Sequence, residues 1–218
     1  IPLKMLECAK RVIVITYMFK GCVLDCFLKI KGIRTVVCKD IVPTKTLKPS
    51  DFKDLITIVP PNKKTKMLKM SYTWWNSLTK EDTKFVNSIA NLISNTANQY
   101  GIAPEDVVWT CPKANAQGLL KEKKIKLNPK GFVRYTDEDG AKHSCWLSVH
   151  TRATNDYSHK KLVAHCYNRY PLQAIKTYLI TCGAPIDEPR YAISSLLQFT
   201  WRSQIRNDKP IVLLIANH

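Results

Sequence analysis

The chain has 218 residues, 45% of them hydrophobic, so it can bury a core and is too apolar for a disordered protein. Its 34 lysines and arginines outweigh 17 acidic residues, and the net charge of +17 favours a polyanionic partner. No apolar run is long enough for a transmembrane helix, and the eight cysteines include no CxxC pair. These features predict no membrane partner and a reducing compartment.

The N-terminal part contains three runs rich in Val, Ile, Thr and aromatic residues: RVIVITYMF, VLDCFLKIKG and IRTVVCKDIV. Lys-Gly pairs separate them, which predicts a three-stranded antiparallel meander over 11–42. A long helix from Leu3 to about Ile30 is the alternative, because apolar residues also recur there at helical spacing. Prolines then punctuate the chain, so we expect a β-rich segment with a Pro-rich linker over 1–62 and a core over 63–218.

Lysines at positions 63, 64, 66 and 69 follow a double proline. They fit a solvated linker and equally fit an arm that contacts phosphates. The sequence leaves both interpretations open.

A helix is predicted from Thr79 to Tyr100, with one apolar face and Gly101 as its stop. Thr79 and Asp82 have the spacing of a capping box with the shorter acid. Pro104 is expected to begin a shorter helix that carries the apolar residues VVW.

The second half alternates between predicted helices and one hairpin. FVRYT and KHSCWLSVH flank the turn DEDG, which predicts two antiparallel strands. Residues 157–199 read as three helices broken at Pro171, Gly183 and Pro185, and the tail IVLLIA as a buried strand or short helix. The predicted fold class is therefore α+β, a helix-dominated core with an N-terminal β-meander and one internal β-hairpin.

Basic and aromatic residues are interleaved from position 121 onward, a pattern typical of surfaces that neutralise phosphates and stack unpaired bases. The predicted phosphate contacts are Lys121, Lys123, Lys124, Lys126, Lys130, Arg134, Lys142, Arg152, Lys160, Lys161 and Arg169. The predicted stacking residues are Phe132, Tyr135, Trp146, Tyr157 and Tyr167. In the alternative interpretation the rings belong to the core and the lysines to a solvated surface.

Four of the five histidines fall within the 23 residues 143–165, which invites a metal site. The candidate zinc ligands are His143, Cys145, His159 and His165, although their spacing is not that of a zinc finger. A Cys145–His165 nucleophile pair is a second possibility without a recognisable oxyanion hole. No GxGxxG, Walker, HExxH or GxSxG motif is present, so we predict no catalytic residue and no cofactor, with zinc as the alternative.

The stretch KKLVAHCYNRYPLQAIKTYLITCGAPIDEP, together with helix 79–100 and the following GIAPEDVVW, resembles coat proteins of flexuous filamentous plant RNA viruses of the potexvirus and carlavirus kind. The resemblance covers part of the chain. Lys161 stands where those coats carry Arg, and the Asp of their later Phe-Asp pair is missing. The resemblance implies that Lys161 lies in an RNA groove and that subunits exchange terminal arms in a helical filament.

The sequence thus predicts a structural protein of the viral coat or nucleoprotein type that binds single-stranded RNA with tolerance of base sequence. We expect a homo-oligomer, located in the host cytoplasm or in a virion. The alternatives are a zinc-dependent or Cys–His enzyme acting on nucleic acid and a basic ribosomal or organellar structural protein.

Overall fold

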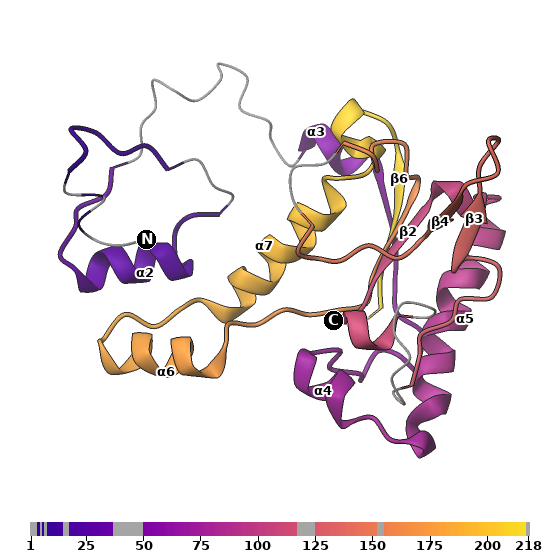
Figure 1. The fold of residues 1–218 in the computed structure, drawn as a ribbon, viewed down its shortest axis with the longest axis horizontal. Coiled ribbons are helices and arrows are strands. Elements are labelled where there is room, and N and C mark those ends of the chain that lie inside the picture. Colours follow the sequence, from indigo (N-terminus) through magenta and orange to yellow (C-terminus); the bar gives the residue numbers. More distant parts are fainter. Residues whose placement is uncertain are drawn as a thin grey trace.

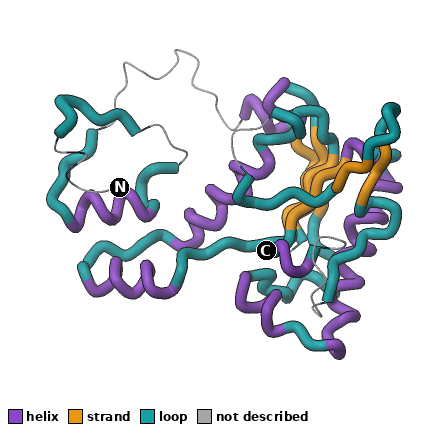
Figure 2. The backbone as a smooth tube through the Cα atoms, viewed as in Figure 1, coloured by secondary structure: helices purple, strands orange, loops and turns teal. Residues whose placement is uncertain are grey.

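A computed structural model describes residues 4, 6, 8–14, 18–36, 50–116, 125–151 and 155–216. Its centre is a parallel sheet in the order β1-β6-β5-β2. Helices lie on both sides of this sheet (Figures 1 and 2). The four strands are β1 (Ile56–Val59), β2 (Val107–Thr110), β5 (Leu162–His165) and β6 (Ile211–Ile215).

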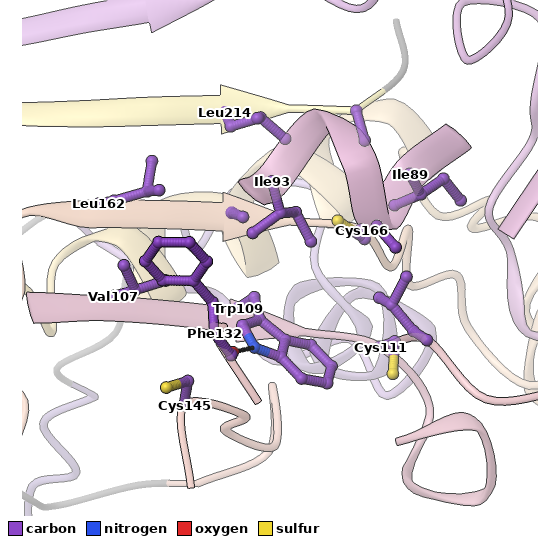
Figure 3. Packing of buried hydrophobic residues seen from close by; sticks show 14 of the residues in the cluster. Ile89, Ile93, Val107, Trp109, Cys111, Phe132, Cys145, Leu162, Cys166 and Leu214 are labelled. Atoms are coloured by element: carbon purple, nitrogen blue, oxygen red, sulfur yellow. Dashed lines mark hydrogen bonds between the residues drawn. The ribbon is translucent and has the colours of Figure 1, made fainter. Parts of the chain in front are cut away.

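One face of the sheet is covered by α5 (Thr83–Gln99). Its Ile89 and Ile93 are fully buried and share a core with Val107 and Leu162 (Figure 3). Because side chains alternate along a strand, the intervening residues point to the other face.

The opposite face packs against the C-terminal end of α7 (Glu188–Thr200). Phe199 packs there with Val108, Val163 and Leu213, all buried. Burial on both faces is what makes the strands of a parallel sheet read as continuous apolar runs.

The predicted α+β fold is therefore wrong, because the protein is α/β with a parallel sheet. The runs VVW and LVAH, which the sequence analysis assigned to helices, are β2 and β5. A short run that is apolar on every side has no period that separates a strand from a buried helix. The edge strand β1 likewise comes from an apolar run that the sequence analysis placed within the linker.

The N-terminal meander is also wrong where the structure describes it. Residues Val23–Ile30 form helix α2, which packs through Cys26 against Leu179 and Ile186. The carboxylate of Asp25 accepts a hydrogen bond from the N–H of Gly21 at 2.7 Å and stabilises the start of this helix. Residues 15–17 and 37–42, which belong to the same prediction, lie outside the described residues.

The predicted elements that have a clear apolar periodicity or clear capping and turn residues are confirmed. The capping pair is present, since the Asp82 carboxylate accepts the Thr79 N–H at 2.8 Å ahead of α5. The confirmed elements also include the hairpin β3 (Arg134–Thr136) and β4 (Lys142–Ser144), helices α6 (Gln173–Thr181) and α7, and the final strand β6.

Two short helices complete the described part, α3 (Ser50–Lys53) and α4 (Tyr72–Ser77). Short 3-10 turns precede α5, β2 and β6 and follow β2. Within the described residues, no helix combines the length and the apolar character that crossing a bilayer requires.

Trp109 on β2 binds the segment of chain that runs between β2 and β5, at Phe132. Its fully buried indole donates a hydrogen bond of 2.7 Å to the carbonyl of Phe132 (Figure 3). We expect Trp109→Phe to lower the free energy of unfolding by at least about 2 kcal/mol, because it strands a buried carbonyl and leaves a void. Urea denaturation measures this loss. Trp74→Phe, at a half-buried ring on α4, should cost less than about 1 kcal/mol, and an equal loss in both variants would contradict the assignment.

Candidate functional site

The carboxyl ends of the parallel strands meet at one edge of the sheet, where open α/β sheets bind their ligands. We call this the carboxyl edge and define it by the described loops 60–71, 111–116 with 125–127, and 166–172. Helix α4, the segment that leaves β5 and the carboxyl end of β6 lie together here (Figure 1). These loops are the first place to look for a site.

Charge is distributed unevenly between the two ends of the sheet. The described loops of the carboxyl edge contain no acidic residue. The loops at the amino ends of the strands contain a mixture of signs: Asp51, Lys53, Asp54, Glu105, Asp106, Asp156, Lys160, Lys161, Asp208 and Lys209. The basic residues of the carboxyl edge are Lys63, Lys64, Lys66, Lys69, Lys113, Lys126 and Arg169.

The loop after β1, residues 62–70, is a compact turn that we call the lysine turn. The side-chain oxygen of Asn62 accepts the N–H groups of residues 64 and 65, each at 2.9 Å. Thr65, Leu68 and Met70 are buried and anchor the turn. The lysines at 63, 64, 66 and 69 are exposed, so the anchored backbone directs cations into solvent.

The lysine turn is joined to the loop that follows β5. Asn168 donates its backbone N–H to the Met70 carbonyl at 2.9 Å and its side-chain amide to the Lys69 carbonyl at 3.1 Å. The indole of Trp75 donates to the Cys166 carbonyl at 3.0 Å. These bonds hold Arg169 and the lysine turn in one assembly.

The third loop adds cations from the connection after β2. Asn115 donates to the Ile125 carbonyl at 3.0 Å, and Lys126 donates to the Ala114 carbonyl at 2.6 Å. The two ends of this connection therefore lie together at the carboxyl edge. Residues 117–124 lie between them in sequence and outside the described residues, and they include the predicted contacts Lys121, Lys123 and Lys124.

Other predicted contacts lie at the opposite end of the strands. Lys161 forms a 2.6 Å ion pair with Asp106, whose carboxylate raises the pKa of the lysine. Lys160 is buried with its ammonium 4.6 Å from the Tyr135 ring and donating to the Glu105 carbonyl, and burial lowers its pKa. Lys161 and Arg169 thus lie at opposite ends of β5, and the structure does not gather the predicted contacts on one surface.

The remaining predicted cations are peripheral. Arg134 and Lys142 are exposed on the same face of the hairpin, beside the amino end of β2. Lys130 is exposed in the turn before it. Arg152 lies outside the described residues.

The predicted stacking rings mostly face inward. Phe132 is buried, and the Trp146 indole donates to the Cys111 carbonyl at 3.0 Å. Tyr157 and Tyr167 are half-buried against the core, and burial raises the pKa of both. Tyr135 stacks on His143 with ring centroids 5.1 Å apart.

Two exposed rings that the sequence analysis did not select lie at the carboxyl edge. Tyr72 is 62% exposed beside the lysine turn, and Tyr170 is 46% exposed beside Arg169. Their position next to cations in the sequence was the available signal. Topology was needed to show that these two stretches meet.

The candidate zinc ligands are dispersed. His143 pairs with Asp137 at 2.6 Å and lowers the pKa of that carboxyl group, while His159 contacts the Glu105 carbonyl at 3.2 Å. Cys145 is buried, which raises the pKa of its thiol to about 11. In the described part of the chain, no three His, Cys, Asp or Glu side chains are grouped so that they could hold a metal ion.

Two buried polar side chains lie beneath the carboxyl edge. Thr110 and His165 are register partners at the ends of β2 and β5. Within the described residues, the Thr110 hydroxyl and the His165 Nε2 have no hydrogen-bond partner. Burial lowers the pKa of His165 to about 4, and its ring packs edge-on against Phe199 with centroids 5.8 Å apart.

Comparison with known proteins matches residues 50–218 to the family model of the YonV C-terminal Rossmann-like domain. The chain is 30% identical over 126 residues, 58% of its length, to the SPbeta prophage-derived uncharacterized protein YonV of Bacillus subtilis strain 168. That match spans 27% of the relative, so the chain covers little more than a quarter of it. No solved structure matches the chain.

The resemblance to filamentous plant virus coat proteins is therefore wrong. The stretch that carried it, KKLVAHC, contains β5 of a parallel sheet instead of a coat-protein helix. The match to a Rossmann-like family covers the same residues. Lys161, which the resemblance placed in an RNA groove, is paired with Asp106.

His165 predicts a specific acid sensitivity. The unfolded chain takes up a proton at this histidine below about pH 6.5, whereas the folded protein does so only near pH 4, so stability falls as pH drops through this window. At pH 4.5, His165→Phe should abolish about 2–3 kcal/mol of the acid-induced loss in the free energy of unfolding. Urea denaturation at pH 8, 7 and 4.5 measures it. The two proteins should change in parallel between pH 8 and 7, and an equal loss at pH 4.5 would refute the prediction.

Proposed function

The chain belongs to the YonV C-terminal Rossmann-like domain family, and for this fold we propose that the carboxyl edge binds single-stranded nucleic acid through its phosphates. RNA is the form that we would test first, as the sequence analysis expected. Binding is tolerant of base sequence, because the exposed groups recognise the backbone.

The observation that carries this proposal is the uniform sign of charge at the carboxyl edge. Seven basic side chains and no acidic one occupy its described loops. Lys63, Lys64 and Lys66 have no carboxylate partner among the residues that the structure describes. Lysines that do not neutralise a neighbouring acid are available to neutralise phosphates.

A dinucleotide cofactor fits this edge poorly. Dinucleotide-binding sheets carry a Gly-rich turn after the first strand, which lets backbone N–H groups approach a pyrophosphate. Here β1 is followed by PPNKKTK, in which prolines lack N–H groups and no glycine is present. Mobile ammonium groups replace a fixed amide cradle, and such groups suit a polymer whose phosphates occur at repeated intervals.

The exposed rings favour a single strand over a duplex. Tyr72 and Tyr170 lie beside the lysine turn and Arg169, and unpaired bases can stack on such rings. The bases of a duplex are already stacked and do not offer their faces.

Binding of a fluorescent single-stranded RNA, measured by anisotropy at several salt concentrations, tests the proposal. Affinity should fall with salt at about −0.7 in log–log slope for each phosphate contacted. The double variant Lys63→Gln/Lys66→Gln should bind more weakly and flatten the slope by about 1.4.

The matched control is Lys53→Gln/Lys209→Gln, which removes the same charge from exposed positions at the amino ends of β1 and β6. It should leave the slope nearly unchanged. Single-stranded DNA and duplex RNA of the same length show which strand chemistry is preferred. Equal effects of the two double variants, or a binding curve that salt does not alter, would disprove an interface at the carboxyl edge.

A further inference from the structure

A cavity of about 140 Å³ lies along α7, apart from the lysine turn. One face of α7 forms its floor, and residues 149–150 and Arg169 form one side. The N-terminal residues Met18, Gly21 and Cys22 form the other wall. The N-terminal part, drawn in indigo, lies beside α6 and the start of α7 (Figure 1).

The floor of the cavity is polar. Arg190, Ser194 and Gln198 line it at four-residue spacing along one face of α7, and Arg202 lines it just beyond the end of the helix. The Gln198 amide donates to the Ser194 hydroxyl at 3.1 Å. Among the described residues, the Ser194 hydroxyl donates to no acceptor and is available to a ligand.

Two guanidinium groups in the cavity, those of Arg169 and Arg190, form no ion pair with any carboxylate that the structure describes. The Nε of Arg190 is buried without a hydrogen-bond partner in the described structure. The guanidinium of Arg169 lies 6.0 Å from the Tyr191 ring and forms no ion pair with a described acid. Both arginines are half-buried, but the Arg190 Nε is a buried donor, and such a donor is costly unless a ligand supplies an acceptor.

Acids that adjoin the cavity residues in the structure have other partners, and Glu188 pairs with Lys176 at 2.6 Å. Asp187 accepts the backbone N–H of Arg190 at 2.9 Å and caps α7. Asp25 forms a 2.7 Å ion pair with Lys29. None of these carboxylates supplies the missing partner.

The N-terminal wall is held closely against α7. Gly21 accepts the Asp187 N–H at 3.2 Å through its carbonyl and has φ +81°, a conformation that favours glycine. A Cβ at this position would lie 3.0 Å from the Cβ of Asp187. The wall therefore lies tightly against Asp187, and a Cβ at position 21 would also lie 3.9 Å from the Cδ of Arg190, at ordinary van der Waals distance.

Arg202 fixes the far end of the cavity. Its guanidinium donates to the carbonyls of Ser148, Val149 and Thr151, which holds the loop that carries His150. Arg202 is thus a positioning residue that also contributes positive charge. Arg169 and Arg190 remain as the groups that a ligand would contact.

We propose that this cavity binds a phosphate monoester anion through Arg169, Arg190 and the Ser194 hydroxyl. Guanidinium groups present paired N–H donors that match phosphate oxygens, and a monoester carries close to two negative charges at pH 7. The cavity is smaller than the roughly 300–1,000 Å³ of sites for drug-sized ligands, so it fits one phosphoryl-sized group. That group belongs either to a free small molecule or to the 5′ end of a strand.

Isothermal titration of the complete chain with inorganic phosphate, adenosine 5′-monophosphate, and a trinucleotide with and without its 5′-phosphate tests this site. Inorganic phosphate should bind, and Arg190→Gln and Arg169→Gln should each weaken it at least tenfold. The matched control is Arg34→Gln, an exposed arginine in the N-terminal part that does not line the cavity. It should bind phosphate as the unaltered chain does.

Preference for the 5′-phosphorylated trinucleotide over its 5′-hydroxyl form assigns a strand end, and binding of only the small phosphates assigns a free ligand. Ser194→Ala, which removes no charge, gives a second readout if an arginine variant fails to fold, and it should weaken phosphate severalfold. Lys63→Gln/Lys66→Gln should not affect phosphate binding, so failure here is distinguishable from failure at the carboxyl edge. Absence of binding by every phosphate compound, or equal binding by the Arg190→Gln and Arg34→Gln variants, would overturn the proposal.

Discussion

Burial of the parallel sheet on both faces is the constraint on which the rest of the structure depends. The strands β2, β5 and β6 are buried because α5 packs on one face of the sheet and the C-terminal end of α7 on the other, whereas the edge strand β1 keeps Ile58 exposed. In this arrangement the loops that connect strands and helices all lie at the ends of the strands. Polar loops therefore gather at two edges, and the chain direction shared by all four strands makes those edges chemically different. The carboxyl edge is positive because the loops that follow the strands are rich in lysine, and because the parallel direction brings those loops to one side of the sheet.

The sequence predicted those elements whose periodicity, capping residues or turn residues are all visible within one short stretch. The α5 helix has an amphipathic face and a capping pair, and the hairpin has its turn residues, so both were found. β2 and β5 were missed because VVWT and LVAH are buried on all sides, which removes the period that identifies a strand. Which side of a sheet a residue contacts depends on pairing between distant segments, such as Val108 with Val163, and no local pattern encodes it.

Because local patterns do not encode which segments pair, the sequence analysis identified only some of the residues at the carboxyl edge. Counting cations and rings selected Arg169 and Lys126, which lie at the carboxyl edge, together with Lys160 and Lys161, which lie at the other end of the strands. The residues that flank a four-residue strand on either side are about 16 Å apart, so closeness along the chain is a poor guide to a shared surface. The bonds between Asn168 and the lysine turn join residues about a hundred positions apart, and only the fold brings them together.

The wall that Gly21 forms over α7 has an implication for how such a domain diversifies. The family match begins at residue 50, whereas Met18, Gly21 and Cys22 precede it. The arginine-bearing floor is thus part of the matched domain, and the N-terminal wall of the cavity belongs to the flank upstream of it. Exchange of that flank would alter which molecules enter without disturbing a single strand pairing. The strand pairings of the domain and one wall of its cavity are thus encoded in separate stretches of the chain.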